Sequence, residues 1–170
     1  GVQTCALRSE DIIFTEFEFS PNYKSWKQVR NKYISIIGDY LLKFSESEIN
    51  TYFENWLAQI NKYLQQEPTK SQMNGLMGFS LLHYFFKDVD QLKNCLGTIY
   101  EMFKSKNIEI AKAATQAVYW LSHETPDAVN LLKTPLNMAF KWIANKDSEF
   151  YTNALLIIKK AKKFADLERS

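Results

Sequence analysis

The sequence predicts an all-α protein, and three observations support that prediction. The 170-residue chain is 46% hydrophobic yet contains only five glycines and four prolines, which suits long helices joined by short corners. Apolar side chains recur at steps of three and four residues through most of the chain, the spacing of one face of a helix. A small, apolar segment that follows a polar corner occurs three times, at nearly equal intervals.

The interval between these segments predicts how the helices are assembled. The three segments are residues 76–82, 114–121 and 154–161. The polar corners near Thr69, Asn107 and Asp147 lie 38 and 40 residues apart. A period of about 40 residues that contains two helices is typical of HEAT and armadillo arrays. We therefore predict an α-α superhelix, a HEAT- or armadillo-like solenoid of about seven helices in antiparallel pairs, because one pair cannot bury its apolar face alone.

Residues 1–22 differ from the rest of the chain. Apolar and acidic side chains alternate there, with Ile13, Phe17 and Phe19 on one side and Glu16 and Glu18 on the other. This period of two indicates extended backbone. We expect an N-terminal arm whose aromatic side chains lie on the first helices, followed by a helical repeat domain over residues 23–170. The alternative is a segment that pairs with another part of a larger protein.

The first two helices are expected over residues 23–44 and 46–65. The apolar stripe of the first helix consists of Trp26, Val29, Tyr33, Ile36, Ile37, Tyr40, Leu41 and Phe44. Between the two helices, Ser45 and Glu48 have the spacing of a capping box, in which each side chain accepts from the other residue's backbone N–H. Pro68 and Thr69 end the second helix and cap the next.

Three further helices are expected over residues 70–86, 90–104 and 108–122, with a polar corner at residues 87–90. The last of the three is rich in alanine: Ala111, Ala113, Ala114 and Ala117. Small side chains let neighbouring helices approach closely, which the inner helices of a stacked repeat require.

The C-terminal part predicts two more helices. Residues 125–127, Thr-Pro-Asp, cap a sixth helix that Pro135 interrupts, because proline removes a donor and clashes with the preceding turn. We expect a kink or a fresh start at Thr134. A seventh helix is expected over residues 148–165. Since it has no partner, we expect the array to continue beyond Ser170.

The sequence contains no pattern that indicates catalysis or metal binding. Neither His83 nor His123 has a second histidine or a cysteine at metal-ligand spacing. We expect His83 to be structural and His123 to complement the C-terminal end of a helix. Nucleophile-elbow, phosphate-loop, dinucleotide-binding and HExxH motifs are absent, and Glu46, Glu48 and Glu54 occupy exposed helix positions. We therefore predict a non-enzymatic protein with no cofactor, no metal and no small-molecule substrate.

Two sets of residues are candidates for contact with a partner. The candidate basic contact patch consists of Lys159, Lys160, Lys162 and Lys163. It could bind phosphate or an acidic partner, or it is a solvated outer face that suits the end of a helix. The four tryptophans are Trp26, Trp56, Trp120 and Trp142. We expect them to pack in the core or between repeats, whereas an exposed one would be a candidate binding hot spot.

Charge, cysteine content and hydropathy restrict the partners and the location. The net charge of +2 is too small to indicate nucleic acid. Cys5 and Cys95 form no disulfide or zinc pattern, which favours a reducing compartment and hence the cytoplasm, with the nucleus as the alternative. No apolar run is long enough to span a membrane, and no signal-peptide pattern is present. Because the chain begins at Gly1 without a methionine, we expect a segment of a longer protein.

Four segments of the chain follow the order of a known helical-repeat family. Residues 47–57 resemble its acidic-serine start and the following helix with Phe-Tyr near its beginning. Residues 72–82 fall where the family has a Lys-Gly-Gly helix ending in Ala-Ser-Leu-Ile; this chain keeps a Ser-Leu-Leu end but has Gln-Met-Asn instead of Lys-Gly-Gly. Residues 114–122 and 138–143 follow its Ala-Ser-Lys-Ala-Ile and Ala-Leu-Glu-Trp-Leu segments. On these pieces, residues 31–165 resemble the N-terminal HEAT-repeat region of the TOR (target of rapamycin) kinases.

The resemblance implies that the parent is a very large Ser/Thr kinase. This segment would be part of the helical scaffold that binds regulatory subunits, such as a substrate-presenting raptor-type protein. The kinase domain, the rapamycin-binding domain and the nucleotide-binding residues would lie elsewhere. No functional residue carries over, because the family's repeat motif is a packing motif.

Three functional hypotheses follow. The leading one is a non-catalytic scaffold module that mediates protein–protein interaction, its partner being a regulatory subunit or the rest of a larger chain. The second is a free-standing HEAT or armadillo adaptor. The third is a helical-repeat nucleic-acid enzyme, such as the HEAT-like DNA alkyl-base glycosylases, which need a concave basic cleft with an acidic residue and a tryptophan at its centre.

Overall fold

The described residues form an all-helical structure. The computed structural model describes residues 17–65, 69–103, 105 and 107–124. Its helices are α2 (Tyr23–Leu41), α3 (Glu46–Gln65), α4 (Thr69–Phe86), α5 (Val89–Phe103) and α6 (Ile108–Glu124). Within these ranges there is no strand, which confirms the predicted all-α class. The five helices match the first five that the sequence predicts.

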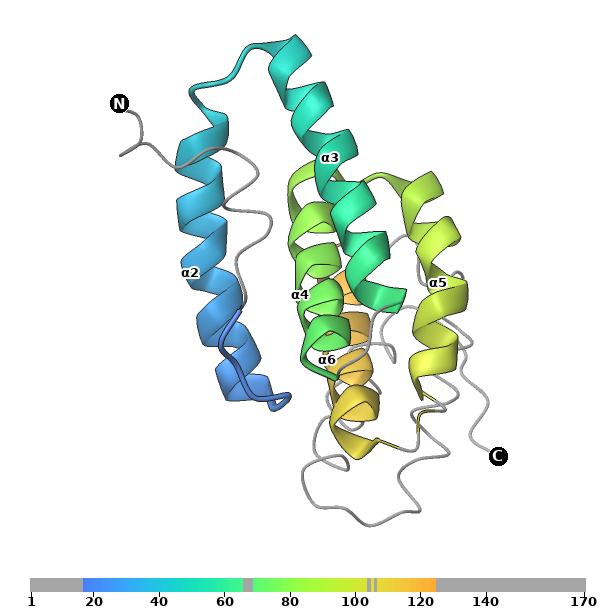
Figure 1. Ribbon diagram of the computed structural model, residues 1–170. Helices are drawn as coiled ribbons and strands as arrows, with labels where there is room; N and C mark the ends of the chain where they lie inside the picture. Colours follow the sequence, from blue (N-terminus) through green and yellow to red (C-terminus); the bar gives the residue numbers. More distant parts are fainter. Residues whose placement is uncertain (1–16, 66–68, 104, 106, 125–170) are drawn as a thin grey trace.

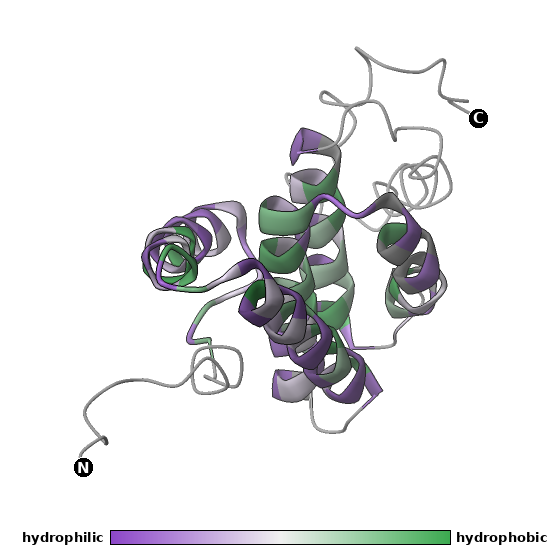
Figure 2. Cartoon of the chain, turned by 90° about the horizontal axis from the view of Figure 1, so that it is seen from above, coloured by the Kyte–Doolittle hydropathy of each residue, from purple (hydrophilic) through white to green (hydrophobic). Residues whose placement is uncertain are grey.

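Successive helices run in opposite directions, so alternate helices point the same way (Figure 1). The most extensive contact is between α3 and α4, followed by α4 with α6 and α5 with α6, and α2 contacts α4. Seen from above, α4 and α6 lie at the centre, with α2 on one side and α5 on the other (Figure 2). The core therefore surrounds α4 and α6.

The two central helices are buried on all sides. Residues 74–83 of α4 and residues 110–118 of α6 are buried without interruption. By contrast, α3 buries one stripe only, made of Tyr52, Trp56, Leu57, Ile60 and Leu64. A helix that is buried around its whole circumference lies inside a core, and one that buries a single stripe lies at its edge. The four predicted alanines of α6 are completely buried, as expected for close helix packing.

Glycine allows α3 to approach α4. A Cβ atom added at Gly75 would lie 2.8 Å from Cδ2 and 3.0 Å from the backbone nitrogen of Leu64. At Gly78 the nearest atom would be Cγ1 of Ile60, at 3.3 Å. Since carbon atoms in contact normally lie about 3.5–4.0 Å apart, any side chain at residue 75 would force the two helices apart.

Polar side chains cap α3, α5 and α6, and the sequence predicts the first of these caps. The capping box before α3 is confirmed: the Glu48 N–H donates to Ser45 Oγ at 3.2 Å, and the Ser45 N–H donates to Glu48 Oε1 at 3.1 Å. At the corner before α5, the Asp90 N–H donates to Asp88 Oδ1 at 3.0 Å. Asn107 caps α6 in the same way, through the N–H of Glu109 at 3.0 Å.

The first helix is shorter than predicted. The sequence predicts it over residues 23–44, but α2 ends at Leu41. The backbone tightens there, because the Lys43 N–H donates to the Tyr40 carbonyl and the Phe44 N–H to the Leu41 carbonyl, bonds of the i→i+3 type. Phe44 then packs edge-to-face against Tyr40 and against Tyr52 of α3. Phe44 therefore keeps the helical spacing of the α2 apolar stripe, although its backbone lies beyond the end of the helix. The other helix ends lie within two residues of their predicted positions.

Several predictions fall outside the described residues. They include the sixth and seventh helices, the cap at residues 125–127 and the kink near Pro135. The division into an arm of residues 1–22 and a repeat domain of residues 23–170 stays a prediction. Within the described helices, none is both long and apolar enough to cross a membrane.

Candidate interaction site

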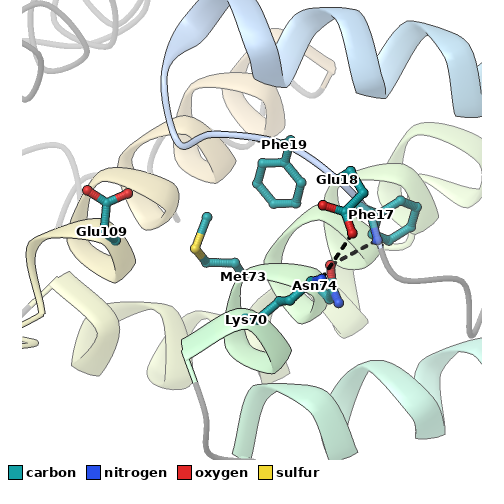
Figure 3. A pocket seen from close by; sticks show the side chains of 7 residues that line it. All are labelled: Phe17, Glu18, Phe19, Lys70, Met73, Asn74 and Glu109. Atoms are coloured by element: carbon teal, nitrogen blue, oxygen red, sulfur yellow. Dashed lines mark hydrogen bonds and ion pairs between the residues drawn. The ribbon is translucent and has the colours of Figure 1, made fainter.

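A groove lies where the extended residues 17–20 meet the first turns of α4 and α6 (Figure 3). Its volume is about 330 Å³. The residues that line it are Phe17, Glu18 and Phe19 from the extended segment, Lys70, Met73 and Asn74 from α4, and Glu109 from α6. Three parts of the chain that are distant in sequence thus form one concave surface.

The extended segment is attached at both of its ends. The Phe17 N–H donates to Asn74 Oδ1 at 3.1 Å, a contact between buried residues. The Ser20 N–H donates to Ser25 Oγ at 2.8 Å, at the beginning of α2. A buried donor that loses its acceptor costs about 1–3 kcal/mol, so the Asn74 amide has a strong influence on where Phe17 lies.

Aromatic rings hold the segment against α2. The Phe17 ring meets that of Tyr33 edge-to-face, with 4.8 Å between the centroids, and the Phe19 ring meets that of Trp26 at 5.1 Å. Phe17 and Trp26 are buried, whereas Phe19 remains half-buried at the groove. Edge-to-face aromatic pairs contribute about 0.5–1.5 kcal/mol beyond the area that they bury. The groove wall is therefore part of the folded core.

Charged groups stand at the rim of the groove. Lys70 Nζ lies 3.0 Å from Glu18 Oε1, and their side chains are 50% and 83% exposed. An exposed pair of this kind contributes about 0–1 kcal/mol, so it opens easily. Glu109 is also exposed and makes no ion pair with any residue in the described part of the chain. The groove therefore combines apolar surface from Phe19 and Met73 with an excess of carboxylate.

A second polar cluster is buried and lies between helices. The Arg30 guanidinium of α2 pairs with Glu124 at the end of α6, where the two side chains are 4% and 12% exposed. Its Cζ lies 4.4 Å from the centroid of the Trp120 ring and 5.2 Å from that of Tyr84. One side chain thus links α2 to both central helices. Removal of one partner from a buried pair costs about 3–5 kcal/mol, because the other charge is left uncompensated.

Titratable groups beside this cluster are held in their neutral forms. Burial lowers the pKa of His83 from its usual value of 6.5, although the Glu124 carboxylate acts in the opposite direction. Burial, together with the neighbouring Tyr23, raises the pKa of Tyr119 to about 12. Tyr23 also stacks on Trp120, with 5.7 Å between the centroids and 7° between the ring planes. Tyr23, Tyr119 and Trp120 thus pack α2 against α6. His83 of α4 is buried, as expected for a structural histidine.

The structure places only some of the residues that the sequence singles out. Trp26, Trp56 and Trp120 are buried in the core, as predicted. Trp142 lies outside the described residues. So does the candidate basic contact patch of Lys159, Lys160, Lys162 and Lys163, which the structure therefore does not test.

The sequence does not predict the residues that form the groove or the buried ion pair. Arg30 could have been suspected, because it falls on the apolar stripe between Trp26 and Ile37, where a charged residue needs a partner. Nothing in the sequence indicates that Glu109 and Lys70 lie at the same groove.

The described residues contain no group of three or more His, Cys, Asp or Glu side chains that could hold a metal ion. Comparison of the chain with protein-family models, with curated proteins and with solved structures found no match in any of the three. The described fold therefore defines the class only broadly, as an all-helical protein.

Proposed function

We propose that this chain is a non-catalytic helical-repeat scaffold module that binds protein partners. The observation that carries the proposal is the packing of alternate helices. α2 contacts α4 and α4 contacts α6, while α3 and α5 each pack against the next central helix. This is the order of contacts expected when helical pairs stack side by side in a solenoid.

The proposal extends to the kind of larger protein to which this chain belongs. The pieces that resemble the TOR kinases include residues 72–82 and 114–122. These lie within α4 and α6, the two helices that stack at the centre. In a TOR-like kinase this segment would contribute to the scaffold that holds regulatory subunits. A free-standing HEAT or armadillo adaptor is the alternative that the same packing supports.

The groove favours a protein partner over nucleic acid. A nucleic-acid enzyme of the alkyl-base glycosylase type needs a basic cleft with a tryptophan at its centre. The groove has two carboxylates to one ammonium group, and no tryptophan is among its lining residues. Repulsion from phosphate opposes nucleic-acid binding at such a surface.

Cross-linking of the native full-length protein, purified from its own cells, tests the scaffold function. A lysine-reactive cross-linker followed by mass spectrometry should join exposed lysines such as Lys24, Lys27 and Lys70 to a second polypeptide or to a distant part of the parent chain. If the protein purifies alone and these lysines link only to their near neighbours, the scaffold proposal is wrong.

Two further measurements separate the alternatives. A kinase domain downstream in the same open reading frame supports the TOR-like origin, and its absence refutes that origin and leaves the free-standing adaptor. Fluorescence anisotropy with a labelled DNA duplex tests the enzyme hypothesis, because specific binding through phosphate contacts falls steeply with salt. We expect no such binding at 150 mM salt, about the physiological ionic strength.

A further inference from the structure

The groove beside the extended segment has the properties of a peptide-binding site. Its volume of about 330 Å³ lies at the lower end of the range for ligand pockets, which is large enough to receive one large side chain. Phe19 and Met73 supply half-buried apolar surface for that side chain. Figure 3 shows both residues between Glu109 on one side and Glu18 on the other.

The backbone beside the groove has main-chain groups that a bound chain can reach. The Phe17 and Ser20 N–H groups are occupied, by Asn74 and Ser25 respectively. Within the described part of the chain, the main-chain groups of Glu18 and Phe19 make no hydrogen bond. Peptide recognition commonly combines main-chain hydrogen bonds, which supply affinity, with side-chain pockets, which supply specificity.

Charge decides which peptide fits. Lys70 and Glu18 neutralise each other, which leaves the exposed Glu109 as the uncompensated charge at the rim. A cationic side chain next to the apolar one would therefore gain Coulomb energy from Glu109 and, by displacing Lys70, from Glu18 as well. An acidic side chain would meet repulsion from the same two carboxylates.

We propose that this groove binds an extended segment of a partner protein in which a large apolar side chain lies next to an arginine or lysine. The inference rests on the proposed scaffold function and deepens it, because it names the site and the chemistry of the partner. The apolar side chain would lie against Met73 and Phe19, and the cation would lie at Glu109.

Glu109 also has a simpler role that the test must separate. It lies in the first turn of α6, where a carboxylate interacts favourably with the helix dipole whether or not a peptide binds. Glu46 lies in the first turn of α3 and is also exposed. α3 begins at the opposite end of the molecule from the beginning of α6 (Figure 1). Glu46→Gln is therefore a matched control for Glu109→Gln.

The experiment measures anisotropy of a fluorescein-labelled peptide that carries one phenylalanine between two arginines, set in a glycine–serine spacer. Glu109→Gln should weaken its binding about three- to five-fold, the effect expected for loss of an exposed charge pair, and Glu46→Gln should leave it unchanged. A peptide with glutamates in place of the arginines should bind the unaltered chain more weakly. Glu109→Lys should reverse that preference.

Three outcomes would overturn the proposal: equal effects of Glu109→Gln and Glu46→Gln, tighter binding of the glutamate peptide, or no binding of either peptide. Urea denaturation of each variant verifies that it is folded. The cross-linking test distinguishes failure of the groove proposal from failure of the proposed scaffold function. If Glu109→Lys leaves cross-links to a second polypeptide intact, the groove proposal is wrong while the scaffold function stands.

Discussion

The close approach of α3 to α4 makes a quantitative prediction about three glycines. Gly75, Gly78 and Gly97 all lie inside helices, where alanine is intrinsically favoured over glycine by about 1 kcal/mol. Replacement of glycine by alanine therefore brings the same intrinsic gain in helix stability at each site. Any difference among the three variants reports what the added methyl group meets.

The surroundings of the three sites differ strongly. An added Cβ at Gly97 meets nothing within 4 Å, whereas at Gly75 it meets the side chain of Leu64 at 2.8 Å and its backbone nitrogen at 3.0 Å. The side chain can rotate away, but the backbone nitrogen moves only if α3 moves. Overpacking of a core typically costs about 1–3 kcal/mol. We expect Gly97→Ala to stabilise by up to about 1 kcal/mol and Gly75→Ala to be about 1–3 kcal/mol less stable than Gly97→Ala.

Urea denaturation followed by tryptophan fluorescence measures these differences. Gly78→Ala should fall between the other two variants, because its nearest contact, Cγ1 of Ile60 at 3.3 Å, is a side-chain atom and lies farther away than the atoms that Gly75 would meet. An unchanged m-value would show that the surface exposed on unfolding is the same in each variant. If Gly75→Ala is as stable as Gly97→Ala, the α3–α4 interface is wider than described and the reasoning fails.

Further predictions concern charged and titratable groups. Arg30→Met and Glu124→Gln should each destabilise by about 3 kcal/mol, whereas the double variant should lose less than the sum, because no charge is left buried alone; a double-mutant cycle in urea measures this. The N–H and hydroxyl of Ser45 lower the pKa of Glu48 in the folded state, so its contribution is present above pH 4.5 and is lost as pH falls through the folded pKa. Glu48→Gln should therefore be less stable than the unaltered chain at neutral pH, with the difference vanishing in acid. Because burial lowers the pKa of His83, the unfolded chain binds that proton more tightly, and the free energy of unfolding should fall as pH decreases from 6.5 toward the folded pKa. His83→Asn should flatten this part of the pH profile, and an unchanged profile would contradict the assigned burial.

Helix positions were predictable because they depend on interactions between residues close in sequence. The Ser45–Glu48 capping box joins residues three apart, and its geometry follows from residue types and spacing. The end of α2 was not predictable in the same way. Phe44 continues the apolar stripe, but its ring can contact Tyr52 of the next helix whether Phe44 itself lies in a turn or in a helix. Spacing alone does not distinguish these two backbones.

The candidate site could not be predicted, since it joins residues that are far apart in sequence. The contact between Phe17 and Asn74 spans 57 residues, that between Glu18 and Lys70 spans 52, and that between Arg30 and Glu124 spans 94. Each depends on how the extended segment and α2 settle against α4 and α6. An exposed glutamate in the first turn of a helix looks the same in sequence whether it borders a groove or open solvent.

Local chemistry thus predicts the class of the fold and, except at the end of α2, the limits of its helices to within two residues, because a helix needs only a periodic apolar face, suitable caps and the absence of breaking residues. The burial of α4 and α6 on all sides, the ion pair that links α2 to α6, and the groove at Glu109 result from packing. Packing selects among the contacts that the apolar faces permit, and that choice depends on every helix at once.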